Sequence, residues 1–242
     1  MPIQQKDSLR SRPVTGAQTL LGEETSKGDA GSLPAISAYD YQFGPFRACA
    51  LHLRKTKMAY QIAVIVGSLR RESTNRQLAR ALTSLAPADF SFDFVDIGTL
   101  PLYSQDYDAD FPQVARDFKQ KIEAADGLLF VTAEYNRSIP GVLKNALDWG
   151  SRPWGKSVWG GKPGAVAGTS PGATGAALSQ QHLRNVLAYL DVATLGQPEM
   201  FIKHTPAAID ETGKILNDDT RKFFQSFVDR YVAWVKTHCG TR

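Results

Sequence analysis

The stretch QIAVIVGSLRRESTNRQLAR, residues 61–80, decides the fold of this chain. It begins with the apolar run Ile62–Val66, which is too short for a stable isolated helix and rich in β-branched residues. Such a run is typical of a strand buried on both faces of a parallel sheet. Gly67 and Ser68 then permit a tight turn. Apolar residues with helical spacing follow at Leu78, Ala79, Leu82, Leu85 and Ala86, so the stretch predicts a strand, a polar loop and a helix.

The loop between this strand and this helix has the chemistry of an anion site. Ser73, Thr74 and Asn75 carry hydroxyl and amide groups that favour helix N-caps, and Arg70 adds a fork of donors. Unpaired backbone N–H groups and the positive end of the helix converge on the same point. The loop therefore predicts a phosphate site. A plain strand-to-helix turn with an exposed Arg70 is the alternative that the loop alone leaves open.

Short runs typical of strands alternate with longer helical patterns along the rest of the chain. Asp93 places its strand near a sheet edge because the carboxylate needs solvent, and Gly164 is expected to interrupt another strand. The further strands are predicted at residues 90–97, 127–132, 162–168 and within 193–202. Helices are predicted around 114–122 and at 139–150, 176–190 and 219–238.

Five strands that alternate with helices predict an α/β fold, with a five-stranded parallel sheet, right-handed crossovers and helices on both faces. In such sheets, ligands bind outside the carboxyl ends of the strands, where the strand order reverses. Three polar loops, at 67–75, 133–138 and 169–175, follow strands at these ends. One site is therefore expected to contain all three loops.

The composition is that of an ordinary globular protein, with 43% hydrophobic and 21% charged residues in a chain of 242. The formal net charge is +4, but it is unevenly distributed. Residues 1–57 carry 8 Lys and Arg against 5 Asp and Glu, whereas residues 58–242 carry 20 against 19. The part expected to fold is close to neutral, so its composition gives no reason to expect a nucleic-acid partner.

Residues 1–57 are expected to form a flexible N-terminal extension. Their scattered Gly, Ser, Thr and Pro and their mixed charges leave little apolar surface to offset the entropy of ordering them. The aromatic residues within 39–53 leave open that this part packs on the body or on a partner. Met58 stands just before the first strand and resembles a natural start, so the folded domain is expected to span 58–242.

The rest of the composition points to an intracellular setting. Cys49 and Cys239 are far apart and have no metal-spaced neighbours, so both are expected to be reduced thiols. No apolar run approaches the roughly 20 residues of a membrane span, and the N-terminus lacks the apolar core of a secretory signal. The sequence therefore predicts a cytoplasmic protein without a membrane partner.

Four segments, in matching order and spacing, carry a family resemblance. They are GSLRRESTNRQLA at 67–79, PLYSQDYD at 101–108, AEYNRSIPGVLKNALDW at 133–149 and GTSPGATG at 168–175. Over residues 60–205 the chain resembles the NAD(P)H-dependent FMN reductases, a flavodoxin-like family that includes bacterial quinone and chromate reductases. The resemblance implies a three-layer sandwich around a five-stranded parallel sheet, with FMN as cofactor and NADPH or NADH as cosubstrate.

The resemblance also assigns roles to the loops. The loop at 68–75 wraps the FMN phosphate, which suits charge-assisted hydrogen bonds from Arg70. Residues 133–136 match the family's Pro-Glu-Tyr-Asn loop, which holds the isoalloxazine and ribityl parts, although Ala133 replaces the usual proline. The segment at 101–103 borders the flavin and substrate opening. The implied cofactor-binding residues are Ser68, Arg70, Ser73, Thr74, Asn75, Pro101, Leu102, Tyr103, Ala133, Glu134, Tyr135, Asn136 and Ser170.

Tyr135 offers a flat apolar face to the ring and Asn136 a hydrogen bond to its polar edge. A core or interface aromatic is the alternative for Tyr135. No metal site is expected. The alternating acids at 106–110 lack the glycine and distal Glu of a calcium loop, and His182, His204 and His238 are too widely spaced for zinc. No nucleotide P-loop, dinucleotide fingerprint or hydrolase elbow is present.

The resemblance implies an oxidoreductase in which NAD(P)H reduces bound FMN by hydride transfer, after which a quinone, a flavin or a similar small molecule is reduced. No catalytic residue is assigned, because the chemistry belongs to the cofactor. The apolar helix at 139–149 indicates a homodimer or homotetramer. A flavodoxin-like module that binds FMN without catalysis is the alternative. The sequence leaves open the acceptor, the preference for NADH or NADPH and the role of residues 1–57.

Overall fold

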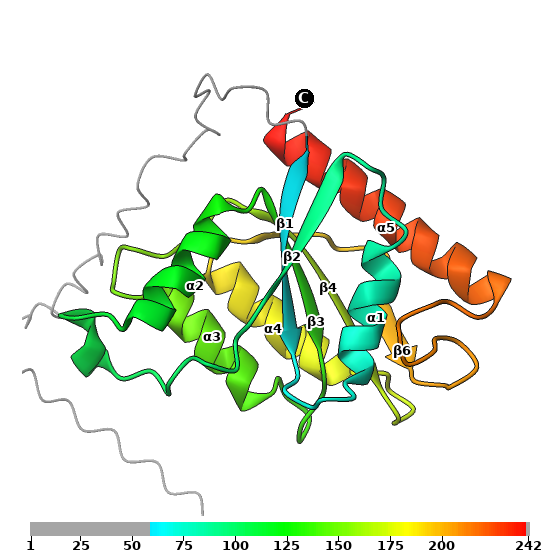
Figure 1. Ribbon diagram of the computed structural model, residues 1–242, viewed down its shortest axis with the longest axis horizontal. Helices are drawn as coiled ribbons and strands as arrows, with labels where there is room; N and C mark the ends of the chain where they lie inside the picture. Colours follow the sequence, from blue (N-terminus) through cyan, green and yellow to red (C-terminus); the bar gives the residue numbers. More distant parts are fainter. Residues whose placement is uncertain (1–58, 241–242) are drawn as a thin grey trace, which may run out of the picture. The chain divides into compact units, whose positions relative to one another are not determined.

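The computed structural model describes residues 59–240. The predicted extension at 1–57 and Cys49 lie outside the described residues. In chain order the elements are β1 (Tyr60–Gly67), α1 (Thr74–Thr83), β2 (Phe90–Val95), the 3-10 helix η1 (Gln105–Asp108), α2 (Gln113–Ala124), β3 (Gly127–Thr132), α3 (Gly141–Ser151), β4 (Pro163–Ser170), α4 (Ala177–Tyr189), β5 (Ala193–Thr194), β6 (Met200–Lys203) and α5 (Asp218–Cys239). Figure 1 shows their arrangement.

All paired strands of the sheet are parallel, in the order β2-β1-β3-β4-β5, and β6 also pairs with β4. This order is that of the flavodoxin-like doubly wound sheet, so the predicted α/β fold is confirmed. The number of strands differs from the expected five because the strand predicted within 193–202 is divided. Between its two halves lies Pro198, which has no N–H to donate to a strand ladder.

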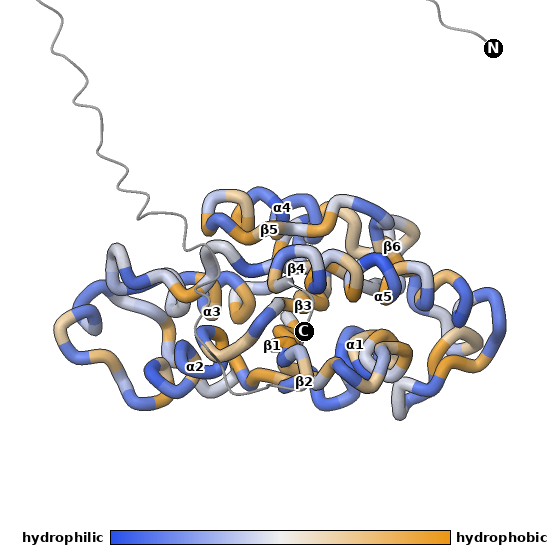
Figure 2. The backbone as a smooth tube through the Cα atoms, turned by 90° about the horizontal axis from the view of Figure 1, so that it is seen from above, coloured by the Kyte–Doolittle hydropathy of each residue, from blue (hydrophilic) through white to orange (hydrophobic). Residues whose placement is uncertain are grey.

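Two apolar cores lie on opposite faces of the sheet. Side chains of α1 and α5 form one core with one face of the strands. Side chains of α2, α3 and α4 form the other. Figure 2 looks along the sheet and shows α2 and α3 on one side of it, with α1 and α5 on the other. The predicted three-layer sandwich is therefore confirmed. Among residues 59–240, no helix combines the length and the apolar character needed to cross a bilayer.

Local residues explain where the strands lie. β3 is buried at all 6 positions and is central, which suits the continuous apolar run of residues 127–132. β2 is an edge strand, as predicted from Asp93, whose carboxylate lies 3.5 Å from the Lys121 ammonium. Gly164 does not interrupt β4, contrary to expectation. A Cβ at this position would lie 2.7 Å from Cγ1 of Val192, so the missing side chain allows close packing within a continuous strand.

Candidate active site

The three polar loops singled out by the sequence meet at one edge of the sheet. The last ladder pairs join Gly67 of β1 to Thr132 of β3, and Thr132 to Gly168 of β4, so these strands end level with one another. Their loops lie together at the lower edge of the view in Figure 1. This is the edge at which parallel sheets bind ligands.

The loop at 68–75, which we call the phosphate loop, buries three of its polar side chains and exposes its charged ones. Ser68 and Ser73 are only 6% and 3% exposed. Ser73 is the N-cap of α1, and its Oγ accepts a hydrogen bond of 3.2 Å from the backbone N–H of Arg76. Its own hydroxyl hydrogen is left to donate to a ligand. Thr74 begins α1, and Arg70 is exposed, with its guanidinium 3.8 Å from the Glu72 carboxylate.

Asn75 uses its side chain to connect two loops of the site. Its Nδ2 donates to the carbonyl oxygen of Thr169, and its Oδ1 accepts from the Thr169 N–H, each over 3.0 Å. The two residues are 94 positions apart, and Asn75 is 3% exposed. The amide thus holds the start of α1 against the end of β4. One N–H of Nδ2 remains for the phosphate contact that the family resemblance implies.

The loop at 133–138 contains a tight turn. The backbones of Tyr135 and Ser138 exchange two hydrogen bonds of 3.0 Å. Between them, Asn136 and Arg137 have φ values of 52° and 66°. Two such values are characteristic of a type I′ turn and are uncommon for residues other than glycine. The turn leaves the side chain of Tyr135 56% exposed, so this aromatic ring is not part of the core.

Glu134 connects the same loop to α4. Its Oε2 accepts hydrogen bonds from the backbone N–H groups of Leu178 and Ser179, at 3.1 and 3.2 Å. The N-cap residue of α4, Ala176, makes no side-chain cap, so a carboxylate from the neighbouring loop stabilises this helix end. The Ser179 hydroxyl donates to the Ala133 carbonyl over 2.8 Å. Both interactions fix the loop backbone between β3 and α4.

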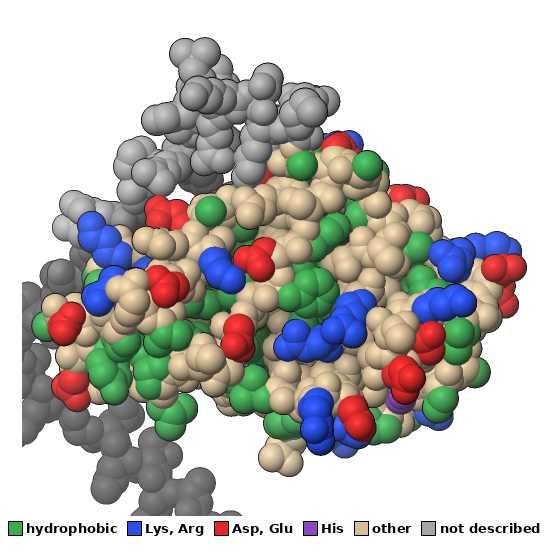
Figure 3. Space-filling model, viewed as in Figure 1, with side chains coloured by type: hydrophobic (Ala, Val, Ile, Leu, Met, Phe, Trp, Pro, Cys, Tyr) green, Lys and Arg blue, Asp and Glu red, His purple; other side chains and the backbone are tan. Residues whose placement is uncertain are grey.

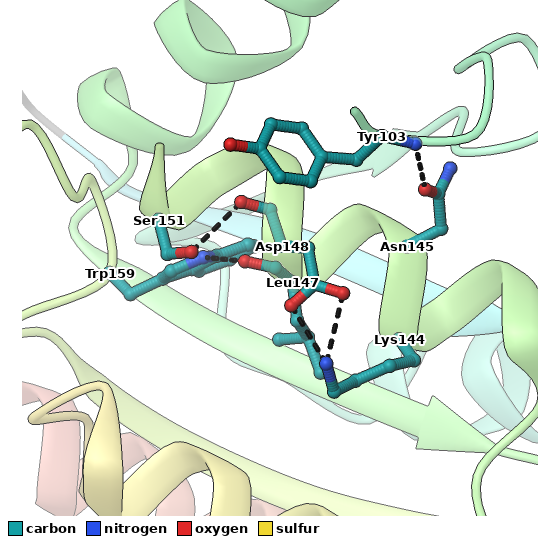
Figure 4. A network of polar contacts seen from close by, with 7 residues as sticks. All are labelled: Tyr103, Lys144, Asn145, Leu147, Asp148, Ser151 and Trp159. Carbon is teal, nitrogen blue, oxygen red and sulfur yellow. Dashed lines mark hydrogen bonds and ion pairs between the residues drawn. The ribbon is translucent and has the colours of Figure 1, made fainter. Parts of the chain in front are cut away.

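The segment at 101–103 lies against α3. The Pro101 carbonyl accepts from Asn145 Nδ2 at 2.9 Å and from Trp149 Nε1 at 2.7 Å. Asn145 Oδ1 also accepts from the Tyr103 N–H at 2.9 Å (Figure 4). The backbone on both sides of Leu102 is therefore fixed, while the Leu102 side chain is 84% exposed. An apolar side chain held out in this way is suited to contact a flat ligand.

Tyr103 is anchored by its ring and its hydroxyl. Its ring meets that of Trp149 edge to face at 5.2 Å, and its hydroxyl donates to Asp108 over 3.0 Å. Burial, followed by the hydrogen bond to Asp108, raises the pKa of Tyr103 above its ordinary value. Asp108, one of the alternating acids at 106–110, thus has a hydrogen-bond partner in the site.

Ser170, the last residue of β4, is half-buried at the same edge as the phosphate loop. Its carbonyl oxygen accepts from the N–H of His204 over 2.8 Å. His182 contacts the Ser138 hydroxyl through Nδ1 at 2.9 Å. Within residues 59–240, no group of three or more His, Cys, Asp or Glu is arranged to hold a metal ion.

Sequence patterns gave no role to Asn145 or Ser179 and counted Trp149 only in the apolar helix expected to form a dimer contact. Each of the three fixes the backbone of a site loop. Asn145 and Trp149 are four residues apart on α3, a spacing that places two side chains on the same helix face. That spacing was the available signal. Their partners in the 101–103 segment lie more than 40 positions away, and no short motif contains both ends of such a contact.

The donors present fit FMN. Buried serine hydroxyls at a helix N-terminus, beside an exposed Arg70, suit a phosphate dianion. The exposed ring of Tyr135, on a turn whose ends are hydrogen-bonded, suits a flat aromatic group at the next strand end. The two ends of the site thus differ in chemistry as the two ends of FMN do.

Comparison with known proteins agrees with this geometry. Residues 60–207 match the family model described as NADPH-dependent FMN reductase. A 2-hydroxy-1,4-benzoquinone reductase from a Burkholderia species is 70% identical over 179 residues, which are 74% of this chain and 98% of that protein. A quinone reductase from Pseudomonas putida is 49% identical over 73% of this chain and 95% of its own length.

A solved structure is similar as well. The flavoenzyme NAD(P)H:(acceptor) oxidoreductase FerB from Paracoccus denitrificans superposes with a TM-score of 0.72 at 43% identity. The match covers 74% of this chain and 99% of FerB. The sheet order, the match over residues 60–207 and these relatives lead to one conclusion: the chain belongs to the family of NADPH-dependent FMN reductases, flavoenzymes that use FMN and NAD(P)H.

Proposed function

We propose that this protein is a quinone reductase that takes electrons from NAD(P)H through bound FMN. The observation that carries the proposal is that β1, β3 and β4 end level with one another at one edge of the sheet. It places a buried, hydroxyl-lined helix N-terminus beside an exposed tyrosine on a tight turn. The relatives named as quinone reductases, at 70% and 49% identity, support quinones as the acceptors.

The chain's own residues bind and orient the cofactor. In this proposal Ser68, Ser73 and the amides of the phosphate loop hold the FMN phosphate, with Arg70 adding a charge-assisted hydrogen bond. Tyr135 and Asn136 contact the ring and its polar edge. When bound, FMN supplies the hydride-transfer chemistry. No side chain of the chain is given an acid or base role.

The acceptor contacts the open side of the site. Leu102 and Tyr135 are 84% and 56% exposed, although the backbone beside each is held by hydrogen bonds. Apolar groups of this kind favour a small flat ring over a strongly hydrated ion. A benzoquinone, as in the name of the Burkholderia relative, has the matching shape.

A homodimer or homotetramer remains part of the proposal, on different grounds from those in the sequence. The apolar side chains of α3 were expected to contact another subunit. Trp149 is instead buried within the chain, against Tyr103, Tyr107 and Phe111. The support comes instead from α4, where Leu178 and Tyr189 are exposed. Sedimentation at low concentration tests it. A monomer that retains full FMN affinity contradicts it.

The function is tested with purified protein. We expect FMN absorbance in a one-to-one ratio and oxidation of NADH or NADPH that depends on added 2-hydroxy-1,4-benzoquinone. A colourless protein whose thermal stability does not rise with FMN contradicts the proposal. Protein that binds FMN but oxidises neither nicotinamide supports the non-catalytic alternative. The cytoplasmic location and the absence of nucleic-acid and membrane partners stay predictions, which cell fractionation checks.

A further inference from the structure

A second polar site borders the phosphate loop. A surface hollow of about 130 Å³ lies between α1 and the segment that follows β6. At about 30 Å³ for each liquid water it holds on the order of four waters, the room that a phosphate group needs. We call it the arginine hollow. Its lining residues are Arg71, Glu72, Ser73, Arg76, Gln77, Arg80 and Glu211.

The charges of the hollow favour an anion. Within residues 59–240, Arg71, Arg76 and Arg80 form no ion pair, whereas neighbouring Arg70 lies 3.8 Å from Glu72. Glu72, one of the two acids that line the hollow, thus already lies near Arg70, which does not line it. Figure 3 shows basic side chains gathered over α1, among scattered acidic ones.

The position of Arg76 and its repulsion with Arg80 disfavour the helix that carries both residues. Arg76 lies in the first turn of α1, where the helix dipole opposes a positive charge. Arg80 lies four residues further on, in the last turn of α1, where the dipole favours a positive charge. The two guanidinium groups nevertheless share a helix face and repel each other. A local arrangement that weakens its own helix is better explained by a ligand than by folding.

The opposite wall of the hollow is built to lie close to α1. Gly213 has a φ of 95°, and a Cβ there would lie 2.6 Å from Cβ of Arg80, so this approach depends on glycine. Asp210 fixes the turn that contains Gly213. Its Oδ1 accepts from the N–H groups of Thr212 and Lys214 and from the Thr212 hydroxyl, at 2.7 to 2.9 Å. The wall therefore holds its shape without a ligand.

We propose that the arginine hollow binds a phosphate group of the nicotinamide cosubstrate. The proposal rests on the proposed function, because it takes the nicotinamide ring to lie on the flavin ring near Tyr135. Ser73 belongs to both the phosphate loop and the hollow, so the hollow begins where the phosphate of FMN would end. A dinucleotide is longer than FMN, so one laid along it extends beyond that phosphate and reaches the arginines.

Two phosphate groups of the cosubstrate share the required chemistry. They are the pyrophosphate, present in NADH and NADPH, and the 2′-phosphate, present only in NADPH. Arginine binds either by paired N–H donors. Fragments that lack the nicotinamide ring, ADP-ribose and 2′-phospho-ADP-ribose, distinguish them and need no turnover.

The test is calorimetric titration of FMN-loaded protein with each fragment. In the double variant Arg76→Gln and Arg80→Gln, we expect affinity to fall at least tenfold while FMN content is unchanged. A fall for both fragments identifies the pyrophosphate, and a fall for 2′-phospho-ADP-ribose alone identifies the 2′-phosphate. The control double variant, Arg221→Gln and Arg230→Gln on α5, removes the same charge outside the hollow and is expected to bind as wild type.

Steady-state kinetics give a second readout. The hollow holds a part of the cosubstrate that does not react, so its loss is expected to raise the KM for NAD(P)H and leave kcat unchanged. The inference is overturned if neither fragment binds the wild type, or if both bind the hollow variant as tightly as the control. Fragment binding without any NAD(P)H oxidation contradicts the proposed function instead.

Discussion

The phosphate loop and the ring-side residues Leu102 and Tyr135 are organised in opposite ways. In the phosphate loop, the polar side chains of Ser73 and Asn75 are 3% exposed and bond to the chain's own backbone. On the ring side α3 holds the backbone around Leu102 and a local turn holds that of Tyr135, while their side chains are 84% and 56% exposed. In the phosphate loop, both the backbone and the side chains are therefore held in place before a ligand binds. On the ring side only the backbone is held.

The largest expected effect comes from breaking the phosphate-loop side. Asn75→Leu leaves both backbone groups of Thr169 buried without their partner. We expect the free energy of unfolding to fall on the order of 3 kcal/mol, with loss of FMN affinity, because the two loops separate. Urea denaturation with and without FMN measures both. Asn185→Leu, at an exposed position of α4, is the control and should change stability by no more than about 0.5 kcal/mol.

Glu134 tests whether the loop that carries Tyr135 is held by α4. Glu134→Ala removes the acceptor for two N–H groups at the start of α4. We expect a loss of about 1 to 2 kcal/mol, the range for losing a helix cap. Glu134→Gln keeps an oxygen acceptor and should recover part of it. Glu123→Ala, at an exposed position of α2, is the control. Equal unfolding midpoints for Glu134→Ala and Glu123→Ala would show that the Glu134 cap does not stabilise the protein.

Tyr135 tests the open side. Because its ring is exposed, Tyr135→Ala should leave the unfolding free energy of the cofactor-free protein within about 0.5 kcal/mol of wild type. FMN binding should weaken by about 1 kcal/mol, roughly fivefold, as an aromatic contact is lost. Tyr135→Phe should bind as wild type. If the cofactor-free Tyr135→Ala protein is destabilised as much as Asn75→Leu, the contrast between the two halves is wrong.

Tyr103 gives the smallest effect, seen as a pH dependence. Burial and Asp108 raise its pKa in the folded state. The contribution of Tyr103 to stability is then fully present below the unfolded pKa near 10 and is lost as pH rises through the raised folded value. Ultraviolet titration of tyrosinate should show two late-ionising groups, Tyr103 and Tyr231, because burial raises the pKa of Tyr231 well above its ordinary value. Tyr103→Phe should remove one of them. If Tyr103→Phe removes no late-ionising group, the anchoring of this loop is contradicted.

The parts of the fold that depend on local patterns were predictable from the sequence. The run at 127–132 coincides with β3, and the predicted ends of the long helices agree with α3, α4 and α5 to within about two residues. The level strand ends follow from the same patterns, because parallel strands with helical crossovers bring their carboxyl ends together. The sequence alone therefore predicts the meeting of the three loops.

The remaining features depend on contacts between distant residues. The bond of Asn75 to Thr169 spans 94 positions, and that of Glu134 to Leu178 spans 44. Gly164 looks like a strand breaker until Val192 is placed against it. The division of the last strand follows from which parts of residues 193–203 can reach β4. The binding roles of the thirteen residues taken from the family remain predictions, and the variants above test those of Asn75 and Tyr135.

The two edges of the sheet affect how the protein behaves in concentrated solution. An exposed edge strand is a template for pairing with another molecule and so for aggregation. Here one edge, β2, carries the charge of Asp93 in its middle. The other is divided into β5 and β6, of 2 and 4 residues, with Pro198 between them. A charged edge and an interrupted edge both discourage strand-to-strand fibril growth. The division into β5 and β6, which made the last strand hard to predict, thus protects the folded chain from association through its sheet.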